Sequence, residues 1–383
     1  MTIAIWQADA GLPTWAPLEA SRREDIVIVG AGLAGLALAR SLRDRGLDPL
    51  VIDAHGPAAG ASGRNAGFVL RTHVTEYPQL RARVGIELAR ALLTLARDNH
   101  ERIAKLGAHR RRGSLMLASG PEELATLTEA QLLLAADGVR TTEVAIPRGL
   151  SGFDAALRID DDGEVHPGRL VTRLADGTRG LRARATSIED GVVHCNALTI
   201  EARTIVLATN AWTATLVPSL AHAITPHRAQ MIATAPLPPA LSIPCYASLG
   251  FDYFRQRDDG RVLLGGRRHL FFHEEATDVD ATSPDVQAAL EAYLRTHLPF
   301  ARGAAIEARW SGIMGFSADG LPLAGRLGAG AWILAGWTGH GLGLSLAVAD
   351  RLAARMTGGG ADPILDALDP ERFSADSAMV PGE

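Results

Sequence analysis

Three glycines stand between a short apolar run and an alanine- and leucine-rich segment, in the order Gly30-Ala-Gly32-Leu-Ala-Gly35. Gly30 permits a tight turn, Gly32 leaves room for backbone to approach a pyrophosphate, and Gly35 lets a helix pack closely against a strand. N–H groups at a helix start and the helix dipole favour negative charge at this point. The spacing therefore predicts a site for a dinucleotide diphosphate, which Leu33 and Ala34 help to line.

A strand–helix–strand unit is predicted around these glycines. Residues 25–29 and 50–53 are apolar runs typical of buried strands, and residues 33–45 are typical of a helix. Two parallel strands joined by a helix form the repeating unit of an α/β fold. Asp53, followed by Ala54, ends the second strand, where a carboxylate can bind ribose hydroxyls and would repel a 2′-phosphate.

The composition is that of a globular enzyme, because 47% of the 383 residues are hydrophobic and 21% are charged. The length predicts two packed domains, and the net charge of −5 gives no reason to expect nucleic acid as a partner. Cys195 and Cys245 are the only cysteines and lie in no ligand spacing, so we expect no metal and no disulfide scaffold.

No uninterrupted apolar stretch reaches the about 18 residues of a membrane span, and the N-terminus lacks the features of a signal peptide. We therefore expect a cytoplasmic protein with no membrane span. The sequence leaves the oligomeric state open.

Four further motifs follow along the chain: residues 60–67 (GASGRNAG), 206–212 (VLATNAW), 310–322 (WSGIMGFSADGLP) and 336–341 (GWTGHG). With the first motif they resemble the FAD-dependent amine and amino-acid oxidoreductases of the D-amino-acid oxidase class. The resemblance spans essentially the whole chain. Within the class it is greatest to γ-glutamylputrescine oxidase-like members, beside glycine oxidase-like and sarcosine oxidase-like ones.

The resemblance implies FAD as the cofactor and assigns each motif a part of it. Loop 60–67 meets phosphate and the flavin edge, the strand end at 207–210 closes the adenosine side, and the helix start after 336 stabilises negative charge on the reduced flavin. Beyond the residues already named, the implied cofactor-binding residues are Ala61, Ser62, Arg64, Asn65, Ala66, Gly67, Ala208, Thr209, Trp212, Gly312, Met314, Gly336, Thr338, Gly339, His340, Gly341 and Leu342.

The predicted fold class is α/β, or α+β, because the pattern changes to alternating strands after Arg228. We expect a Rossmann-type FAD-binding domain with a mixed parallel sheet, and a substrate domain built on an antiparallel sheet with flanking helices. One of these is a long amphipathic helix over 79–106. The predicted bounds are an irregular surface leader at 1–24, the FAD-binding domain at 25–78, 155–225 and 308–370, the substrate domain at 79–154 and 226–307, and a tail at 371–383.

Four residues are candidates for the catalytic site: Tyr253, Arg255, Met314 and His340. Tyr253 matches the tyrosine that the family places beside the substrate. At Met314, glycine oxidase-like members carry an arginine that holds a substrate carboxylate, and a thioether cannot do this. Either the substrate lacks an α-carboxylate, or another arginine replaces the missing one. The alternatives are Arg64, Arg71 and Arg255.

Two further departures concern the flavin. Sarcosine oxidase-like members attach FAD to a cysteine where this chain has Gly312, so we expect noncovalent FAD. They also place a lysine beside the flavin to promote reaction with oxygen, whereas Lys105, the only lysine here, lies far from the motifs. His340, His227 or Arg255 are candidates for that positive charge, and His73 for the substrate cavity. Oxygen and another electron acceptor both remain open.

The combined interpretation is an FAD-dependent enzyme that oxidises a C–N bond of a small amine to an imine. The first alternative is an oxidase or dehydrogenase of glycine, sarcosine or a D-amino acid with a relocated carboxylate-binding arginine. Alternatives of another class are a flavin monooxygenase and a non-catalytic FAD-binding redox sensor.

Overall fold

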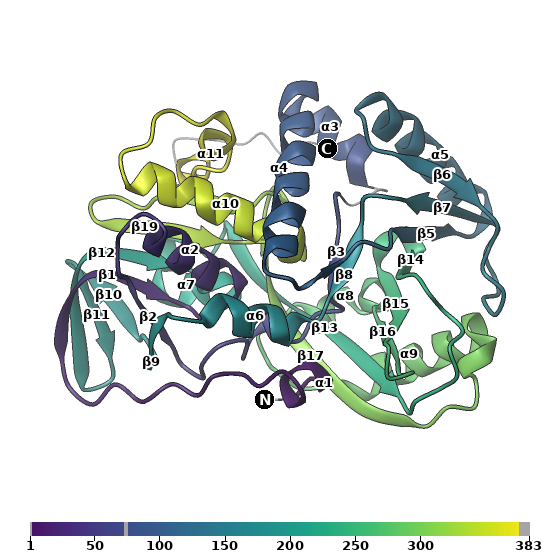
Figure 1. The fold of residues 1–383 in the computed structure, drawn as a ribbon, viewed down its shortest axis with the longest axis horizontal. Helices are drawn as coiled ribbons and strands as arrows, with labels where there is room; N and C mark the ends of the chain where they lie inside the picture. The colour runs from purple at the N-terminus through teal and green to yellow at the C-terminus, as the bar shows by residue number, and fades with distance from the viewer. Residues whose placement is uncertain (1, 73–75, 375–383) are drawn as a thin grey trace. The chain divides into compact units, whose positions relative to one another are not determined.

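The computed structural model describes residues 2–72 and 76–374 (Figure 1). The chain divides into two compact units. Unit 1 comprises Met1–Ala10, Gly63–Leu170 and Arg228–Ile313, and unit 2 comprises Gly11–Ser62, Val171–His227 and Met314–Glu383. Three segments that the sequence analysis assigned to the FAD-binding domain therefore fall in unit 1: residues 63–78, 155–170 and 308–313. The division into cofactor and substrate domains stays a prediction.

A mixed sheet forms the centre of unit 2. Its strands are β1 (Arg22–Val29), β2 (Leu50–Asp53), β9 (Arg179–Arg182), β10 (Ser187–Glu189), β11 (Val192–Cys195), β12 (Leu198–Leu207), β18 (Leu323–Arg326) and β19 (Ala331–Ala335). The order is β10-β11-β12-β1-β2-β9, with β19 beside β12 and β18 beside β19. The pairs β2–β1, β1–β12, β12–β19 and β2–β9 are parallel, whereas β10, β11 and β18 pair antiparallel. The predicted parallel unit is confirmed.

Two helices of unit 2 begin at glycine-rich turns and pack against each other (Figure 1). They are α2 (Leu33–Arg43) and α10 (Gly341–Met356). Both bury mainly alanine and leucine, which let helices approach closely, and Arg45 forms an ion pair with Asp350 at 2.9 Å. The unit also contains α7 (Thr213–Leu216) and α11 (Pro363–Ala367).

An eight-stranded sheet runs through unit 1 in the order β17-β13-β16-β15-β14-β5-β7-β6. Its strands are β5 (Ser114–Ala118), β6 (Thr141–Val144), β7 (Ala155–Ile159), β13 (Ile224–Thr234), β14 (Cys245–Ala247), β15 (Asp252–Gln256), β16 (Val262–Gly265) and β17 (Ile306–Ser317). Most pairs are antiparallel, as predicted for this sheet: β13 with β16, β16 with β15, β15 with β14, β5 with β7, and β7 with β6. The pair of β5 and β14 is parallel. A small sheet joins β3 (Phe68–Val69), β8 (Gly163–Val165) and β4 (His109–Arg110).

The predicted helix over 79–106 is wrong as a single element. The structure has α3 (Tyr77–Val84) and α4 (Ile86–Lys105), separated at Gly85, whose φ of +81° suits glycine and ends a helix. Both helices bury one face, so the apolar spacing in the sequence continues across Gly85. The periodicity alone therefore did not reveal the break between the two helices. The other helices are α1 (Ile5–Ala8), α5 (Gly120–Ala136), α6 (Pro167–Ala175), α8 (Phe272–Glu275) and α9 (Pro284–His297). None of the helices in the described residues is long and apolar enough to cross a membrane.

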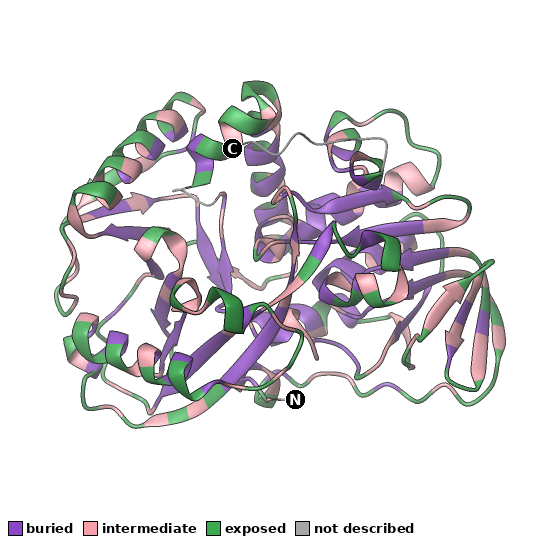
Figure 2. Cartoon of the chain, turned by 180° about the vertical axis from the view of Figure 1, so that it is seen from behind, coloured by how far each residue is buried: buried purple, intermediate pink, exposed green. Residues whose placement is uncertain are grey.

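The N-terminal leader is not confined to the surface, contrary to expectation. Trp6 is 1% exposed, and β1 already begins at Arg22. Figure 2 shows that many of the central strands are coloured as buried. The tail also differs, because Phe373 is buried, and residues 375–383 lie outside the described residues.

One buried and one half-buried histidine give unit 1 a pH-dependent stability. His100 on α4 and His109 on β4 have ring centroids 5.0 Å apart. Burial, reinforced by the proximity of the two rings, lowers the pKa of His100 to about 4, and burial with nearby Arg111 lowers the pKa of His109 to about 4. In the unfolded chain the histidine pKa is about 6.5. The unfolded chain therefore binds more protons as the pH falls from about 6.5 towards 4, and stability is lost across this window.

Between pH 7 and pH 5 the free energy of unfolding should fall, because His100 takes up a proton in the unfolded chain but not in the folded one. We expect this fall to be about 2 kcal/mol smaller in His100→Asn, which has no imidazole to protonate. Urea unfolding at the two pH values measures the difference. His273→Asn is the matched control, since His273 is exposed on α8. An unchanged pH slope in His100→Asn would contradict this assignment.

Candidate active site

The turn between β1 and α2 requires glycine at two positions. Gly30 has a φ of +116°, and a Cβ there would overlap the Ala208 carbonyl. A Cβ on Gly35 would overlap the Gly30 carbonyl, so helix and strand approach each other only because both residues lack side chains. The backbone N–H of Ala208 donates to Val29 at 2.8 Å, which places the strand end after β12 against this turn.

Gly32 is needed for space rather than for backbone freedom. Its φ of −79° is accessible to any residue, but an added Cβ would lie 2.9 Å from the Ser62 hydroxyl. That hydroxyl accepts a hydrogen bond of 2.9 Å from the Leu33 N–H in the first turn of α2. Ala34 and Gly35 follow in the same turn, where helix geometry leaves N–H groups without carbonyl partners in the helix. The turn has the form of a diphosphate cradle.

Asp53 fastens this turn from the end of β2. Its Oδ2 accepts from the Ala31 N–H at 2.9 Å, and its Oδ1 accepts from the N–H groups of His55 and Gly56 at 2.8 and 2.9 Å. The half-buried carboxylate thus lies beside the cradle, and Ala54 lies in the turn that it stabilises. Binding of a ribose by Asp53 stays a prediction.

Asn210 is a positioning residue that the sequence analysis placed only within the strand end at 207–210, without a role for its side chain. Its side-chain Oδ1 accepts from the N–H groups of Gly336 and Trp337 at 3.1 and 3.3 Å, so it links the end of β12 to the loop before α10. Asn210 has a φ of +49°, a conformation that asparagine tolerates better than most residues. The available signal was an asparagine three residues after the end of a buried strand. The neighbouring Thr209 hydroxyl pairs with Thr213 at 3.1 Å.

The loop before α10 is held against the last part of β17. The Thr338 N–H donates to the Gly315 carbonyl at 2.9 Å, and the Thr338 hydroxyl lies 3.0 Å from that of Ser317. His340 is the N-cap residue of α10, so Gly341 and Leu342 open the helix. A Cβ on Gly339 would lie 3.9 Å from the Met314 sulfur. The structure therefore brings Met314 together with this loop.

Two buried tryptophans hold loop 63–67 in unit 1. The Trp310 indole N–H donates to the Arg64 carbonyl at 2.8 Å, and the Trp6 indole N–H donates to the Asn65 carbonyl at 2.7 Å. Within the loop, the Asn65 side chain accepts from the Gly67 N–H at 2.8 Å. Buried indoles need such acceptors, so the tryptophans set the course of the backbone here.

The Arg64 side chain is buried and ion-paired with Asp280 at 2.6 Å. Hydrogen bonds from Ser311, Thr2 and Arg64 outweigh the effect of burial and hold the pKa of Asp280 below its usual range. Arg64 Nε is buried and has no hydrogen-bond partner among the described residues. An unsatisfied buried donor of this kind fits an electron-rich edge of a cofactor.

The Arg255 guanidinium is also engaged within unit 1. It donates to the carbonyls of Val165, Ala66 and Gly67 at 3.0, 3.3 and 3.3 Å, and it pairs with Glu164 at 3.2 Å. Burial lowers the pKa of Arg255 to about 10, although Glu164 opposes the shift. These contacts hold the end of loop 63–67 in place.

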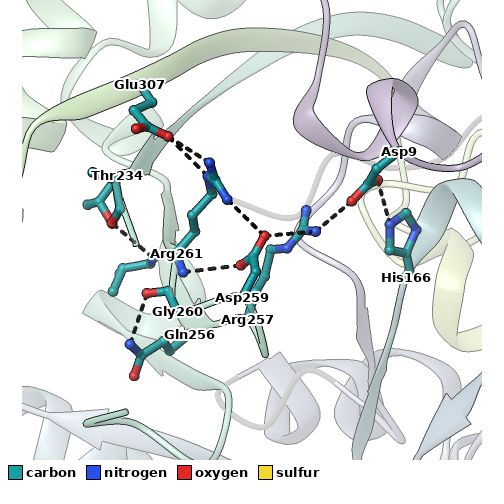
Figure 3. A network of polar contacts seen from close by, with 11 residues as sticks. Asp9, His166, Thr234, Gln256, Arg257, Asp259, Gly260, Arg261 and Glu307 are labelled. Carbon is teal, nitrogen blue, oxygen red and sulfur yellow. Dashed lines mark hydrogen bonds and ion pairs between the residues drawn. The ribbon is translucent and has the colours of Figure 1, made fainter. Parts of the chain in front are cut away.

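A network of charges fastens the N-terminal helix to the turn between β15 and β16 (Figure 3). Asp9 accepts from Arg257 at 2.6 Å and lies 2.7 Å from the His166 ring nitrogen. Arg257 and Arg261 both pair with Asp259 at 3.1 Å. Arg257 also lies over the Trp6 ring at 4.6 Å, so this network supports one of the tryptophans that hold loop 63–67.

Tyr253 on β15 lies opposite Gly265 on β16. A Cβ on Gly265 would overlap the Tyr253 ring, so the missing side chain gives the ring its place on the sheet. The ring of Phe68 meets Tyr253 edge-on at 6.3 Å. Loop 63–67 therefore leads, through Phe68, to the tyrosine that the resemblance assigns to the substrate.

The predicted site residues are thus distributed over both units. Those in unit 1 are Arg64, Asn65, Ala66, Gly67, Tyr253, Arg255 and Gly312. Those in unit 2 are Gly30, Gly32, Leu33, Ala34, Gly35, Asp53, Ala54, Ala61, Ser62, Ala208, Thr209, Trp212, Met314, Gly336, Thr338, Gly339, His340, Gly341 and Leu342. His73 lies outside the described residues.

Three features are typical of dinucleotide-binding α/β proteins. They are the cradle between β1 and α2, the carboxylate of Asp53 at the end of β2, and the glycine-rich loop that opens α10. The FAD dependent oxidoreductase family matches residues 25–355, and the chain belongs to this family. The expected FAD cofactor and the class of enzyme are thereby confirmed.

Known relatives cover most of the chain. The γ-glutamylputrescine oxidoreductase of Escherichia coli (strain K12) is 29% identical over 387 aligned residues, covering 92% of this chain and 85% of the relative. A probable oxidoreductase of Rhizobium meliloti (strain 1021) is 26% identical, with coverages of 87% and 83%.

Solved structures share the fold. L-proline dehydrogenase from P. horikoshii and glycine oxidase from Geobacillus kaustophilus each have a TM-score of 0.75 at 20% identity. The alignment with the first covers 92% of this chain and 98% of the other, and that with the second covers 91% and 98%.

Proposed function

We propose that the chain oxidises the C–N bond of a small amine, or of a metabolite with an amine group, to an imine that water hydrolyses. Bound FAD would supply the two-electron acceptor for this oxidation, with oxygen or another acceptor as the final electron acceptor. The FAD is held noncovalently, because Gly312 stands where related enzymes carry a cysteine.

The residues of unit 2 hold the cofactor in this proposal. The N–H groups of the α2 start bind the diphosphate, and Asp53 binds the adenosine ribose. The N-terminal end of α10, with Gly341 and Leu342, stabilises negative charge that develops on the flavin ring. Asn210 and Thr338 position that loop through the hydrogen bonds described above.

The residues of unit 1 hold the substrate and support the loop next to it. Tyr253 positions the amine, and Arg255 acts as a positioning residue for loop 63–67 through its bonds to the loop carbonyls. His340 at the start of α10 remains a candidate for contact with the substrate or the flavin.

One observation carries the choice of amines over α-amino acids: Met314, an apolar thioether, lies beside the Gly339 loop where related enzymes place an arginine. The three replacement candidates already have carboxylate partners, Arg64 with Asp280, Arg71 with Asp161 at 2.7 Å and Arg255 with Glu164. A guanidinium that is neutralised in this way is a poor second clamp for a carboxylate.

We expect primary or secondary amines to bleach the flavin absorbance of the purified yellow protein under anaerobic conditions. The test screens primary, secondary and N-methyl amines beside amino acids, and then admits air to ask whether oxygen restores the colour. A flavoprotein that no amine reduces would contradict the proposal and favour the redox-sensor alternative.

A further inference from the structure

A small pocket in unit 1 is lined by groups to which the proposed reaction gives no role. Asp162 and Tyr246 lie on it together with Thr72 and the apolar side chains of Leu70 and Met116. It has room for about one water molecule, which is also about the size of an alkylammonium head.

Asp162 is a buried acid without a guanidinium bonded to its oxygens among the described residues. It is 1% exposed and accepts from the Ser114 hydroxyl at 2.6 Å and from the Arg71 backbone N–H at 2.7 Å. The Arg71 guanidinium is turned to Asp161 instead. Burial raises the pKa of Asp162 to about 7, although the hydrogen bonds from Ser114 and Arg71 oppose the shift.

Tyr246 adds a second polar side chain to the pocket. It is 8% exposed and lies on the pocket lining together with Asp162. The ring packs edge-on against Phe68 at 4.8 Å and lies 6.4 Å from the Tyr253 ring. The pocket therefore adjoins the aromatic side chains that lead to the tyrosine of the substrate site.

We propose that the Asp162 pocket binds a second, non-reacting ammonium group, so that the preferred substrates are diamines. This inference rests on the proposed amine oxidation. The carboxylate of Asp162, the phenol oxygen of Tyr246 and the hydroxyl of Thr72 offer acceptors for the three N–H donors of an ammonium. The rings of Phe68 and Tyr253 offer an apolar surface to the alkyl chain, and a cation is attracted to aromatic faces.

The first test compares a linear diamine with the monoamine of the same chain length. In the unaltered holoenzyme, kcat/KM for the diamine should exceed that for the monoamine about tenfold or more, mainly because KM is lower. One charge-assisted hydrogen bond would give a difference of this size. Asp162→Asn keeps the shape and the acceptor for Arg71 but loses the charge, so the preference should vanish while monoamine oxidation stays. Tyr246→Phe should reduce the preference several-fold.

Asp160→Asn is the matched control, because Asp160 lies outside the pocket and pairs with Arg158 rather than with Arg71, so its removal should leave the preference intact. An Asp162→Asn enzyme that keeps the preference, or that loses activity equally on both amines, would overturn the proposal and leave Asp162 a structural role in its turn. If no amine reduces the flavin, the proposed function fails instead.

A binding measurement tests the pocket independently of turnover. Methylammonium chloride should raise the unfolding midpoint of the holoprotein above that in an equal concentration of sodium chloride. The difference should be absent in Asp162→Asn and present in Asp160→Asn. Equal midpoints in the two salts for the unaltered protein would contradict an ammonium site.

Discussion

A Gly32→Val variant is expected to purify folded but almost free of FAD. The φ of −79° at Gly32 allows a side chain, and the nearest obstacle is the tip of the Ser62 side chain rather than backbone. The fold can therefore accept valine, whereas the space above the first turn of α2 cannot hold both valine and a diphosphate. We expect FAD affinity to fall by about a hundredfold or more, which corresponds to about 3 kcal/mol.

The flavin absorbance per protein, combined with circular dichroism, separates loss of cofactor from loss of fold. Gly303→Val serves as control, because a Cβ at Gly303 would contact nothing within 4 Å. Gly30 would be a poor choice for this test, since its φ of +116° makes any substitution a folding defect as well. Stoichiometric FAD in a folded Gly32→Val variant would place the diphosphate elsewhere.

An amine is expected to outcompete its own α-carboxylated analogue by about a thousandfold in kcat/KM. A carboxylate in a largely dry flavin pocket needs a cation or several donors, and burial without them costs several kcal/mol. The Met314 thioether is apolar and offers neither. Arg64, Arg71 and Arg255 already hold carboxylates of the protein.

Matched pairs of amines and amino acids measure this difference directly. Met314→Arg should make the difference smaller by raising kcat/KM for the amino acid of each pair. Met314→Leu keeps an apolar side chain and should leave the difference unchanged. If the carboxylated member already has the higher kcat/KM in the unaltered enzyme, a relocated clamp exists. The search for it would begin with Arg64 and Arg255.

The parallel unit around the glycine motif could be read from the sequence because its signals are local. The apolar run before Gly30, the helix after it and the acid at Asp53 lie within one strand–helix–strand unit, and each has its own periodicity or conformational need. The predicted helix of this unit begins at residue 33, which is where α2 begins. Such features depend on near neighbours in the chain.

Features that depend on residues far away in the chain could not be predicted from the sequence. Trp6 was assigned to a surface leader. The residues near it in the chain do not indicate that its indole N–H donates to the Asn65 carbonyl. Asn210 gained its role only from the hydrogen bonds it accepts from Gly336 and Trp337, more than a hundred residues away. A tertiary contact fixes each of these roles.

The arginines show the same limit most clearly. Residue type alone made Arg64, Arg71 and Arg255 equal candidates for binding a substrate carboxylate, because an arginine offers the same donors wherever it stands. The sequence by itself predicted the diphosphate site, through glycines whose spacing is a local requirement, and the resemblance of its further motifs implied FAD and the enzyme family. Only the tertiary structure decided which charges are already matched: it gave each of these arginines a carboxylate of the protein, and it left Asp162 in a pocket with no guanidinium bonded to it among the described residues. Charge matching depends on distance in space, which residue spacing along the chain does not specify.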